Sequence, residues 1–161
     1  MPTPTRSFDV IELLVRHDVA FIVVGMTAGV LHGAPAVTFD LDIVYARDAA
    51  NIAKLLSALQ ELEAIFRGDE RRLVPNISHL QSTGHKLLMT KFGVVDVLGG
   101  LGELEYPDLL PDVEVMKIHN MNVQVLSLER LIDVKAKAGR DKDIAVLPLL
   151  RATLARAKTP L

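Results

Sequence analysis

Residues 21–45 constrain the fold of this chain more than any other stretch of its sequence. The apolar run FIVV is followed by Gly25, a short segment of small residues (26–32) and the alternating run FDLDIVY. Because side chains alternate between the two faces of a strand, Asp40 and Asp42 share one face, and the other face carries Phe39, Leu41, Ile43 and Tyr45. The sequence therefore predicts a strand, a tight turn, a short helix and a second strand with two carboxylates about 6.5–7 Å apart on an open face.

Periodicity and capping residues predict the other elements. We expect helices over 7–17, with Ser7 as N-cap, and over 48–63. A short strand near 77–81, a hairpin over 85–98, a loop over 99–111 and a second hairpin over 113–127 are expected to follow. The chain is then expected to form helices over 127–138, from 141 and from 148, with Pro148 at the first position of the last one. This order predicts an α/β (α+β) fold, a mixed β-sheet flanked by helices with a C-terminal helical segment over about 127–161. The length of 161 residues predicts one domain.

Composition excludes several classes of site. The chain has no Cys, so it forms neither disulfide bonds nor thiolate metal sites, and any metal must be held by oxygen or imidazole ligands. Its apolar runs are too short to cross a bilayer and its first residues show no export signal, so we expect a cytoplasmic protein without membrane contact. With no Trp, 2 Tyr and 5 Phe, stacking of nucleic-acid bases has little support.

A third carboxylate, Asp96, lies inside the apolar run VVDVL of a predicted strand. An unpaired charge in such a position is costly, which favours a functional role. Carboxylates from neighbouring strands suit one or two Mg²⁺ ions, which prefer oxygen ligands and substrate phosphates. Asp40, Asp42 and Asp96 are therefore predicted to be metal ligands and catalytic residues of a phosphoryl-transfer site, the alternative being carboxylates on a solvated strand face.

Two features suggest a partner for phosphate. Gly25, at a strand-to-helix turn, would let a phosphate approach the backbone, although a turn glycine with a purely structural role fits equally well. Lys135 falls in the apolar stripe of its predicted helix, so it either reaches a phosphate at the sheet or extends out to solvent. His32, at the end of the short helix, is predicted to make a local hydrogen bond and not to act as a catalyst.

The stretch VVGMTAGVLHGAPAVTFDLDIVY resembles the signature of the nucleotidyltransferase superfamily, with the DNA polymerase beta-like fold, and is most similar to small AbiEii-type bacterial members. The residues that match in order are Gly25, Ala28, His32, Gly33, Thr38, Asp40 and Asp42, and LSLERLIDVKAKAGRDKD resembles the closing signature of that group. The resemblance covers roughly residues 8–155. It implies Mg²⁺-dependent transfer of a nucleoside monophosphate from an NTP to a hydroxyl of RNA or protein, with Gly25, Met26, Thr38, Lys135 and Arg140 binding the nucleotide.

Two positions depart from the pattern of the family. Met26 stands where a second glycine is expected, and Ala36 stands where an arginine is expected. Both changes affect the binding of phosphate and leave the carboxylates intact, so two hypotheses stay open. The chain is either an active nucleotidyltransferase or a catalytically degenerate relative that binds a nucleotide or a partner protein. A role in a toxin–antitoxin pair, with an antitoxin-like partner, is implied by the resemblance alone.

Overall fold

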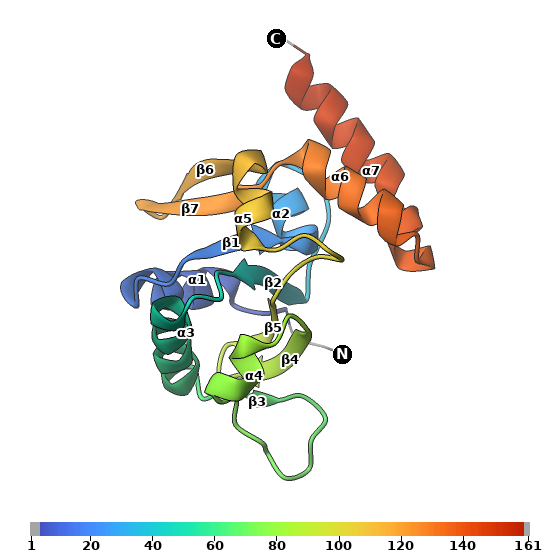
Figure 1. Ribbon diagram of the computed structural model, residues 1–161. Helices are drawn as coiled ribbons and strands as arrows, with labels where there is room; N and C mark the ends of the chain where they lie inside the picture. The colour runs from blue at the N-terminus through green and yellow to red at the C-terminus, as the bar shows by residue number, and fades with distance from the viewer. Residues whose placement is uncertain (1–3, 160–161) are drawn as a thin grey trace.

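The computed structural model describes residues 4–159, which are built around a seven-stranded mixed sheet (Figure 1). The strand order is β3-β4-β5-β2-β1-β7-β6. The strands are β1 (Phe21–Val24), β2 (Asp40–Tyr45), β3 (Ile65–Phe66), β4 (His85–Thr90), β5 (Gly93–Leu98), β6 (Val113–Ile118) and β7 (Met121–Leu126). The pairs β1–β7 and β2–β5 are parallel and the others are antiparallel, as expected for a mixed sheet.

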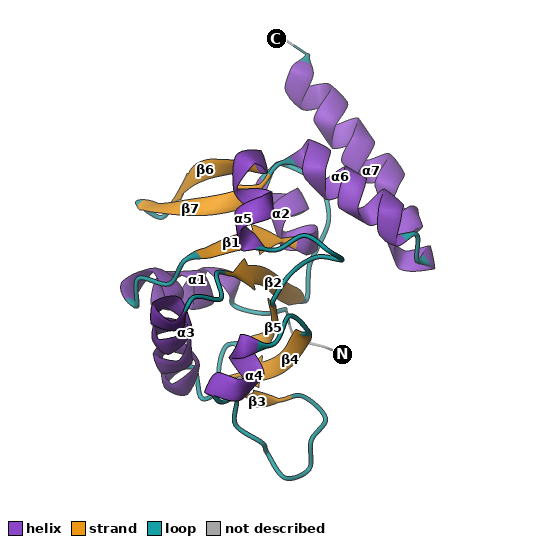
Figure 2. Cartoon of the chain, in the orientation of Figure 1, coloured by secondary structure: helices purple, strands orange, loops and turns teal. Residues whose placement is uncertain are grey.

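The helices lie around this sheet (Figure 2). They are α1 (Ser7–Arg16), α2 (Gly25–Leu31), α3 (Ala49–Glu61), α4 (Ile77–Gln81), α5 (Tyr106–Leu109), α6 (Leu128–Ala138) and α7 (Asp141–Lys158), with a 3-10 turn over Leu110–Asp112. Figure 1 shows α1 and α3 side by side, and α6 and α7 paired at the other end of the view. Among residues 4–159, no helix combines the length and the apolar character that crossing a membrane requires.

The neighbouring strands β2 and β5 bury one face and carry the carboxylates on the other. Leu41 and Ile43 of β2 and Val97 of β5 are completely buried and share one core cluster with apolar residues of α1 and α3. The carboxylates of β2 and β5 occupy the alternate positions, so the period of two predicted from the sequence is confirmed. This arrangement fixes which way Asp40 and Asp42 point.

Capping predictions are confirmed at several helix ends. The Asp48 side chain accepts a hydrogen bond from the backbone of α3, and Ser127 does the same for α6. Gly139 ends α6 with a φ of 66°. The β6–β7 hairpin turns at His119 and Asn120, both of which have positive φ, as a tight turn that matches the twist of its strands requires.

Four local predictions are wrong. Residues 77–81 form helix α4 and not a strand, because Asn76 and His79 make a reciprocal capping box and Leu80 turns into the core. Ser7 is the first residue of α1; Arg6 precedes it and provides no side-chain cap. The loop predicted over 99–111 contains α5 and the start of the 3-10 turn.

Pro148 is the fourth correction, because it lies inside α7 and not at the start of a helix. An interior proline normally breaks a helix, since it removes one backbone hydrogen bond and its ring crowds the preceding turn. Here the buried residues Asp143, Leu147 and Leu150 form one continuous face on both sides of the proline, and Pro148 itself is exposed. Packing along that face therefore outweighs the local cost.

Candidate active site

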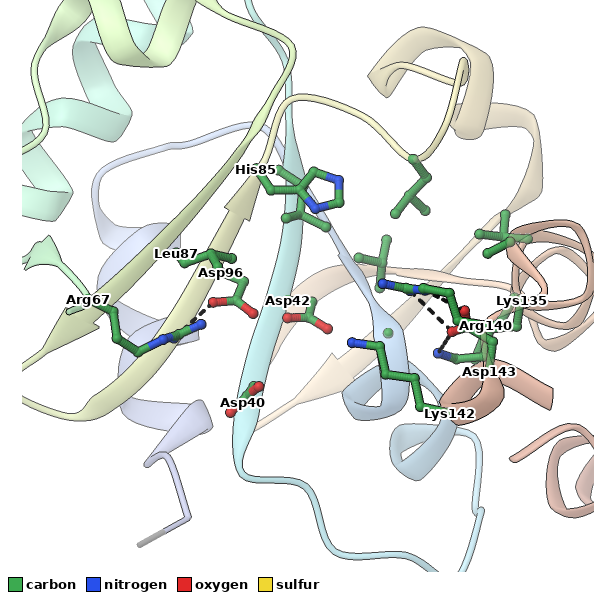
Figure 3. Close-up of a pocket in the computed structure, with 17 residues that line it drawn as sticks. Asp40, Asp42, Arg67, His85, Leu87, Asp96, Lys135, Arg140, Lys142 and Asp143 are labelled. Carbon is green, nitrogen blue, oxygen red and sulfur yellow. Dashed lines mark hydrogen bonds and ion pairs between the residues drawn. The ribbon is translucent and has the colours of Figure 1, made fainter. Parts of the chain in front are cut away.

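The pairing of β2 with β5 brings the predicted carboxylates together. In this parallel pair Asp42 lies directly opposite Asp96, and Asp40 lies two residues earlier on β2, opposite Val94. Since paired residues share a face, the three side chains lie on one wall (Figure 3). Strands that are far apart in the sequence thus build a single carboxylate cluster.

A pocket of about 320 Å³ separates this wall from the C-terminal helices. The sheet and its nearby loops contribute Gly25, Asp40, Asp42, Arg67, His85, Leu87 and Asp96, and α6 and α7 with their junction contribute Leu131, Val134, Lys135, Arg140, Lys142 and Asp143. Figure 3 shows the side chains of Arg140 and Lys142 on the opposite side of the pocket from the carboxylates. Negative charge on the sheet thus faces positive charge on the helices.

Asp42 is the most perturbed group in this pocket. Burial, the neighbouring charge of Asp96 and a hydrogen bond with Asp96 raise the pKa of Asp42 from 3.8 to about 7, with a smaller contribution from Asp40. Lys135 opposes the shift without cancelling it. A carboxylate whose pKa is raised by burial and by a neighbouring carboxylate is typical of functional sites.

The partner of Asp96 is Arg67, a residue that the sequence did not single out. The Arg67 Nη1 atom lies 3.1 Å from Asp96 Oδ1, and their side chains are 31% and 14% exposed. The same carboxylate oxygen is buried and accepts no hydrogen bond, so the contact is an ion pair without directed bonding. Arg67 follows β3 in a charged segment whose sequence gives no hint of this contact.

Asp143 is the second residue that the sequence did not assign to the site. Its side chain is 1% exposed and contacts both predicted phosphate-binding cations. Arg140 donates two hydrogen bonds to it, at 2.6 and 3.2 Å, and Lys135 Nζ lies 3.4 Å away. Burial alone would raise the pKa of Asp143, but the hydrogen bond from Arg140 and the charge of Lys135 lower it. An acid in the buried stripe of α7, beside Leu147, was the signal that could have revealed it.

The other predicted nucleotide-binding residues border a second pocket of about 340 Å³. Met26 and Thr38 line it together with residues shared with the first pocket, namely Asp40, Asp42, Lys135, Arg140 and Lys142. The Thr38 hydroxyl lies 3.5 Å from the Thr27 hydroxyl, which itself donates to the backbone carbonyl of Asp40 at 2.9 Å. Asp40 and Asp42 therefore line both pockets, whereas Asp96 lines only the first.

His32 lies outside both pockets. Its Nε2 atom is 2.8 Å from the carbonyl oxygen of Leu126, and its Nδ1 atom is 3.3 Å from Glu114. His32 therefore makes a hydrogen-bonding contact, as predicted, but its partner Leu126 lies on β7 and not in the same turn of the chain.

Gly25 contacts the carboxylate cluster directly. Its φ is 64°, and a Cβ atom added there would lie 2.2 Å from Asp42 Oδ2. We expect Gly25→Ala to lower the free energy of unfolding by about 2–4 kcal/mol, because a left-handed backbone cost adds to a clash. Gly102→Ala is the matched control: its φ is 58° and no atom lies within 4 Å of the added Cβ. Both free energies of unfolding are measured by denaturant titration. An equal decrease in the two variants would show that the clash with Asp42 contributes nothing.

The donor set fits a divalent cation, although its side chains are not arranged as a preformed metal site in the described part of the chain. Across residues 4–159, no group of three or more His, Asp and Glu side chains is arranged so that it could hold a metal ion. The chemistry is nevertheless favourable, because all three side chains offer hard oxygen donors. A cation would also relieve the repulsion that raises the pKa of Asp42 and would supply a partner for the buried Oδ1 of Asp96.

Neither a family model nor a curated protein matches the sequence, but solved structures do. A Thermotoga maritima protein assigned as a nucleotidyltransferase aligns with 87% of this chain and 86% of its own, with 21% identity and a TM-score of 0.57. The lincosamide antibiotic adenylyltransferase LnuA, bound to lincomycin, aligns over 93% and 98%, with 13% identity and a TM-score of 0.62. The antibiotic-resistance factor ANT(2'')-Ia aligns over 91% and 83%, with 13% identity and a TM-score of 0.56.

These similarities extend over nearly the whole chain in every case. They confirm the fold that the resemblance of the carboxylate strand implied, whereas the AbiEii-type subgroup stays a prediction. The protein therefore has the fold of the nucleotidyltransferase superfamily.

Proposed function

We propose that this protein is a Mg²⁺-dependent nucleotidyltransferase that transfers a nucleoside monophosphate from an NTP to an acceptor hydroxyl. One observation carries the proposal: Asp40, Asp42 and Asp96 on the sheet face Lys135 and Arg140 across one pocket. Carboxylates suit the metal and the cations suit a triphosphate, so the two halves of the required charge pattern are both present.

Each side chain has a definite task in this reaction. Asp40, Asp42 and Asp96 would hold Mg²⁺, which when bound polarises phosphate oxygens and neutralises charge at the reacting phosphorus. Lys135 and Arg140 would bind the triphosphate. Asp96, on the other side of the cluster, would accept the proton of the acceptor hydroxyl as its oxygen bonds to the α-phosphorus. The bond from that phosphorus to the bridging oxygen breaks, and pyrophosphate leaves.

The acceptor is proposed on different grounds. The sequence resemblance favours RNA or protein, and the same resemblance suggests a toxin that pairs with an antitoxin-like protein. LnuA, which shares the fold, is named as an adenylyltransferase of lincosamide antibiotics. The test of function therefore includes all three acceptor classes.

The test is transfer of label from each α-labelled NTP, with Mg²⁺ and either cellular RNA, cellular protein or lincomycin. We expect label to appear in one acceptor class. Asp40→Asn and Asp42→Asn should each reduce transfer about 100-fold or more, because metal ligands supply several kcal/mol of transition-state stabilisation. Asp141→Asn, an exposed acid outside the pocket lining, should transfer normally. Transfer that survives the loss of Asp40 and Asp42 would contradict the proposal.

A second candidate function is nucleotide or protein binding without catalysis. Two observations favour it: Met26 lines the second pocket, where a smaller residue would leave more room for phosphate, and Asp96 is held by Arg67. Calorimetry separates the two functions. Mg²⁺-dependent NTP binding without label transfer selects the binding role, and the absence of binding leaves interaction with a partner protein.

A further inference from the structure

Arg67 stands beside the only member of the carboxylate cluster that lies on β5. We propose that Arg67 is the counter-ion of Asp96 in the metal-free protein and competes with a divalent cation for that carboxylate. The inference rests on the proposed function, because it takes Asp40, Asp42 and Asp96 as the ligands of the cation. It assigns Arg67 a role in setting metal affinity, which neither the sequence motif nor the fold implies.

Arg67 is held in this position by several contacts. Its backbone N–H donates to the Leu87 carbonyl at 2.9 Å, so the backbone is tied to β4. Its Nη1 atom donates to the Leu88 carbonyl at 3.3 Å and lies 3.1 Å from Asp96 Oδ1. With the side chain 31% exposed, the guanidinium is fixed at the edge of the pocket and does not move freely in solvent.

The contact with Asp96 is nevertheless incomplete, and this makes it replaceable. Asp96 Oδ1 is buried and accepts no hydrogen bond, so only the attraction between charges holds the pair. The ion pair of Arg140 with Asp143 is different, because two directed hydrogen bonds join those side chains. A buried carboxylate oxygen without a hydrogen bond gains most from a new positive partner, and a divalent cation supplies twice the charge of a guanidinium.

Removing the guanidinium should therefore act in opposite directions on two measurable quantities. Without metal, Asp96 loses its counter-charge beside Asp42, so the folded protein should become less stable. With metal, no ion pair has to be broken, so affinity should rise. A residue with a purely structural role would lower stability without tightening metal binding.

The experiment measures Mn²⁺ affinity by electron paramagnetic resonance of the free ion, and thermal unfolding in chelator, for the full-length chain. We expect Arg67→Gln to bind Mn²⁺ about 3- to 10-fold more tightly, the range that a partly buried ion pair supports, and to unfold at a lower temperature. Arg67→Lys retains the charge and should bind nearly as the wild type does. Arg71→Gln is the matched control, because Arg71 lies in the same segment after β3 but is exposed and pairs with Asp69.

The outcomes separate the two proposals. Binding of Mn²⁺ by the wild type that Asp42→Asn does not weaken, or no binding, contradicts the proposed function. Asp42-dependent binding in the wild type with unchanged or weaker affinity in Arg67→Gln overturns the role of Arg67 alone. Equal tightening in Arg67→Lys and Arg67→Gln overturns the competition between charges. Since Arg67→Gln is expected to be less stable, its affinity is measured at a low temperature at which circular dichroism shows a folded protein.

Discussion

Replacing Asp143 with Ala is expected to lower the free energy of unfolding by about 3 kcal/mol. Asp143 is 1% exposed and neutralises two cations, one of which, Lys135, is itself only 15% exposed. Removing one partner of a buried ion pair leaves the other charge in a poor environment, which typically costs about 3–5 kcal/mol. The lower end applies here, because Arg140 is 59% exposed and can turn to solvent.

Urea denaturation of three variants tests this expectation. Asp141→Ala, in the same first turn of α7, is the control and should change stability by less than about 0.5 kcal/mol because its side chain is exposed. Arg140→Ala should cost less than Asp143→Ala, since Lys135 then still has its partner. If Asp143→Ala were no more destabilising than Asp141→Ala, Asp143 would not be what holds the two cations in the pocket.

The second large effect is a gain in stability from Asp42→Asn in metal-free protein. The pKa of Asp42 is about 7 in the folded protein, well above its usual 3.8. The folded state therefore binds more protons than the unfolded state between about pH 4 and 7, and the contribution of Asp42 to stability falls as the pH rises through that window. An uncharged amide at this position removes this pH-dependent loss of stability.

The expected result is a difference between the wild type and Asp42→Asn in how the free energy of unfolding depends on pH. In chelator, the advantage of Asp42→Asn over the wild type should grow by about 2–3 kcal/mol between pH 5 and 8, as linkage requires for a shift of this size. Asp40→Asn, on the same strand but exposed, should give a smaller change. Parallel stability curves for the wild type and Asp42→Asn would contradict the raised pKa.

The charged groups of this site lower the stability of the metal-free fold in one place and raise it in another. Asp42 destabilises the metal-free protein at neutral pH, while Asp143 stabilises the helices that face it. Perturbation of this kind is typical of functional groups, because a structural residue with the same environment would be replaced by a neutral one without loss.

Much of the fold could be predicted from local patterns in the sequence. The alternation of β2 placed Asp40 and Asp42 on one face, and the acid within VVDVL identified Asp96. Capping residues fixed the starts of α3 and α6. Local patterns failed at α4, where a capping box overrides a strand-like run, and at Pro148, where packing along α7 overrides a helix breaker.

The sequence by itself determined which residue types stand at the site and which face of each strand they occupy, because alternation along a strand is a property of neighbouring residues. Only the tertiary structure decided the rest. The register of β2 against β5 places Asp42 beside Asp96. The folding of the chain also brings Arg67 to Asp96 and Asp143 to Lys135 as partners in ion pairs. These are contacts between distant segments, whose energies depend on burial and distance in the folded chain and leave no local pattern in the sequence.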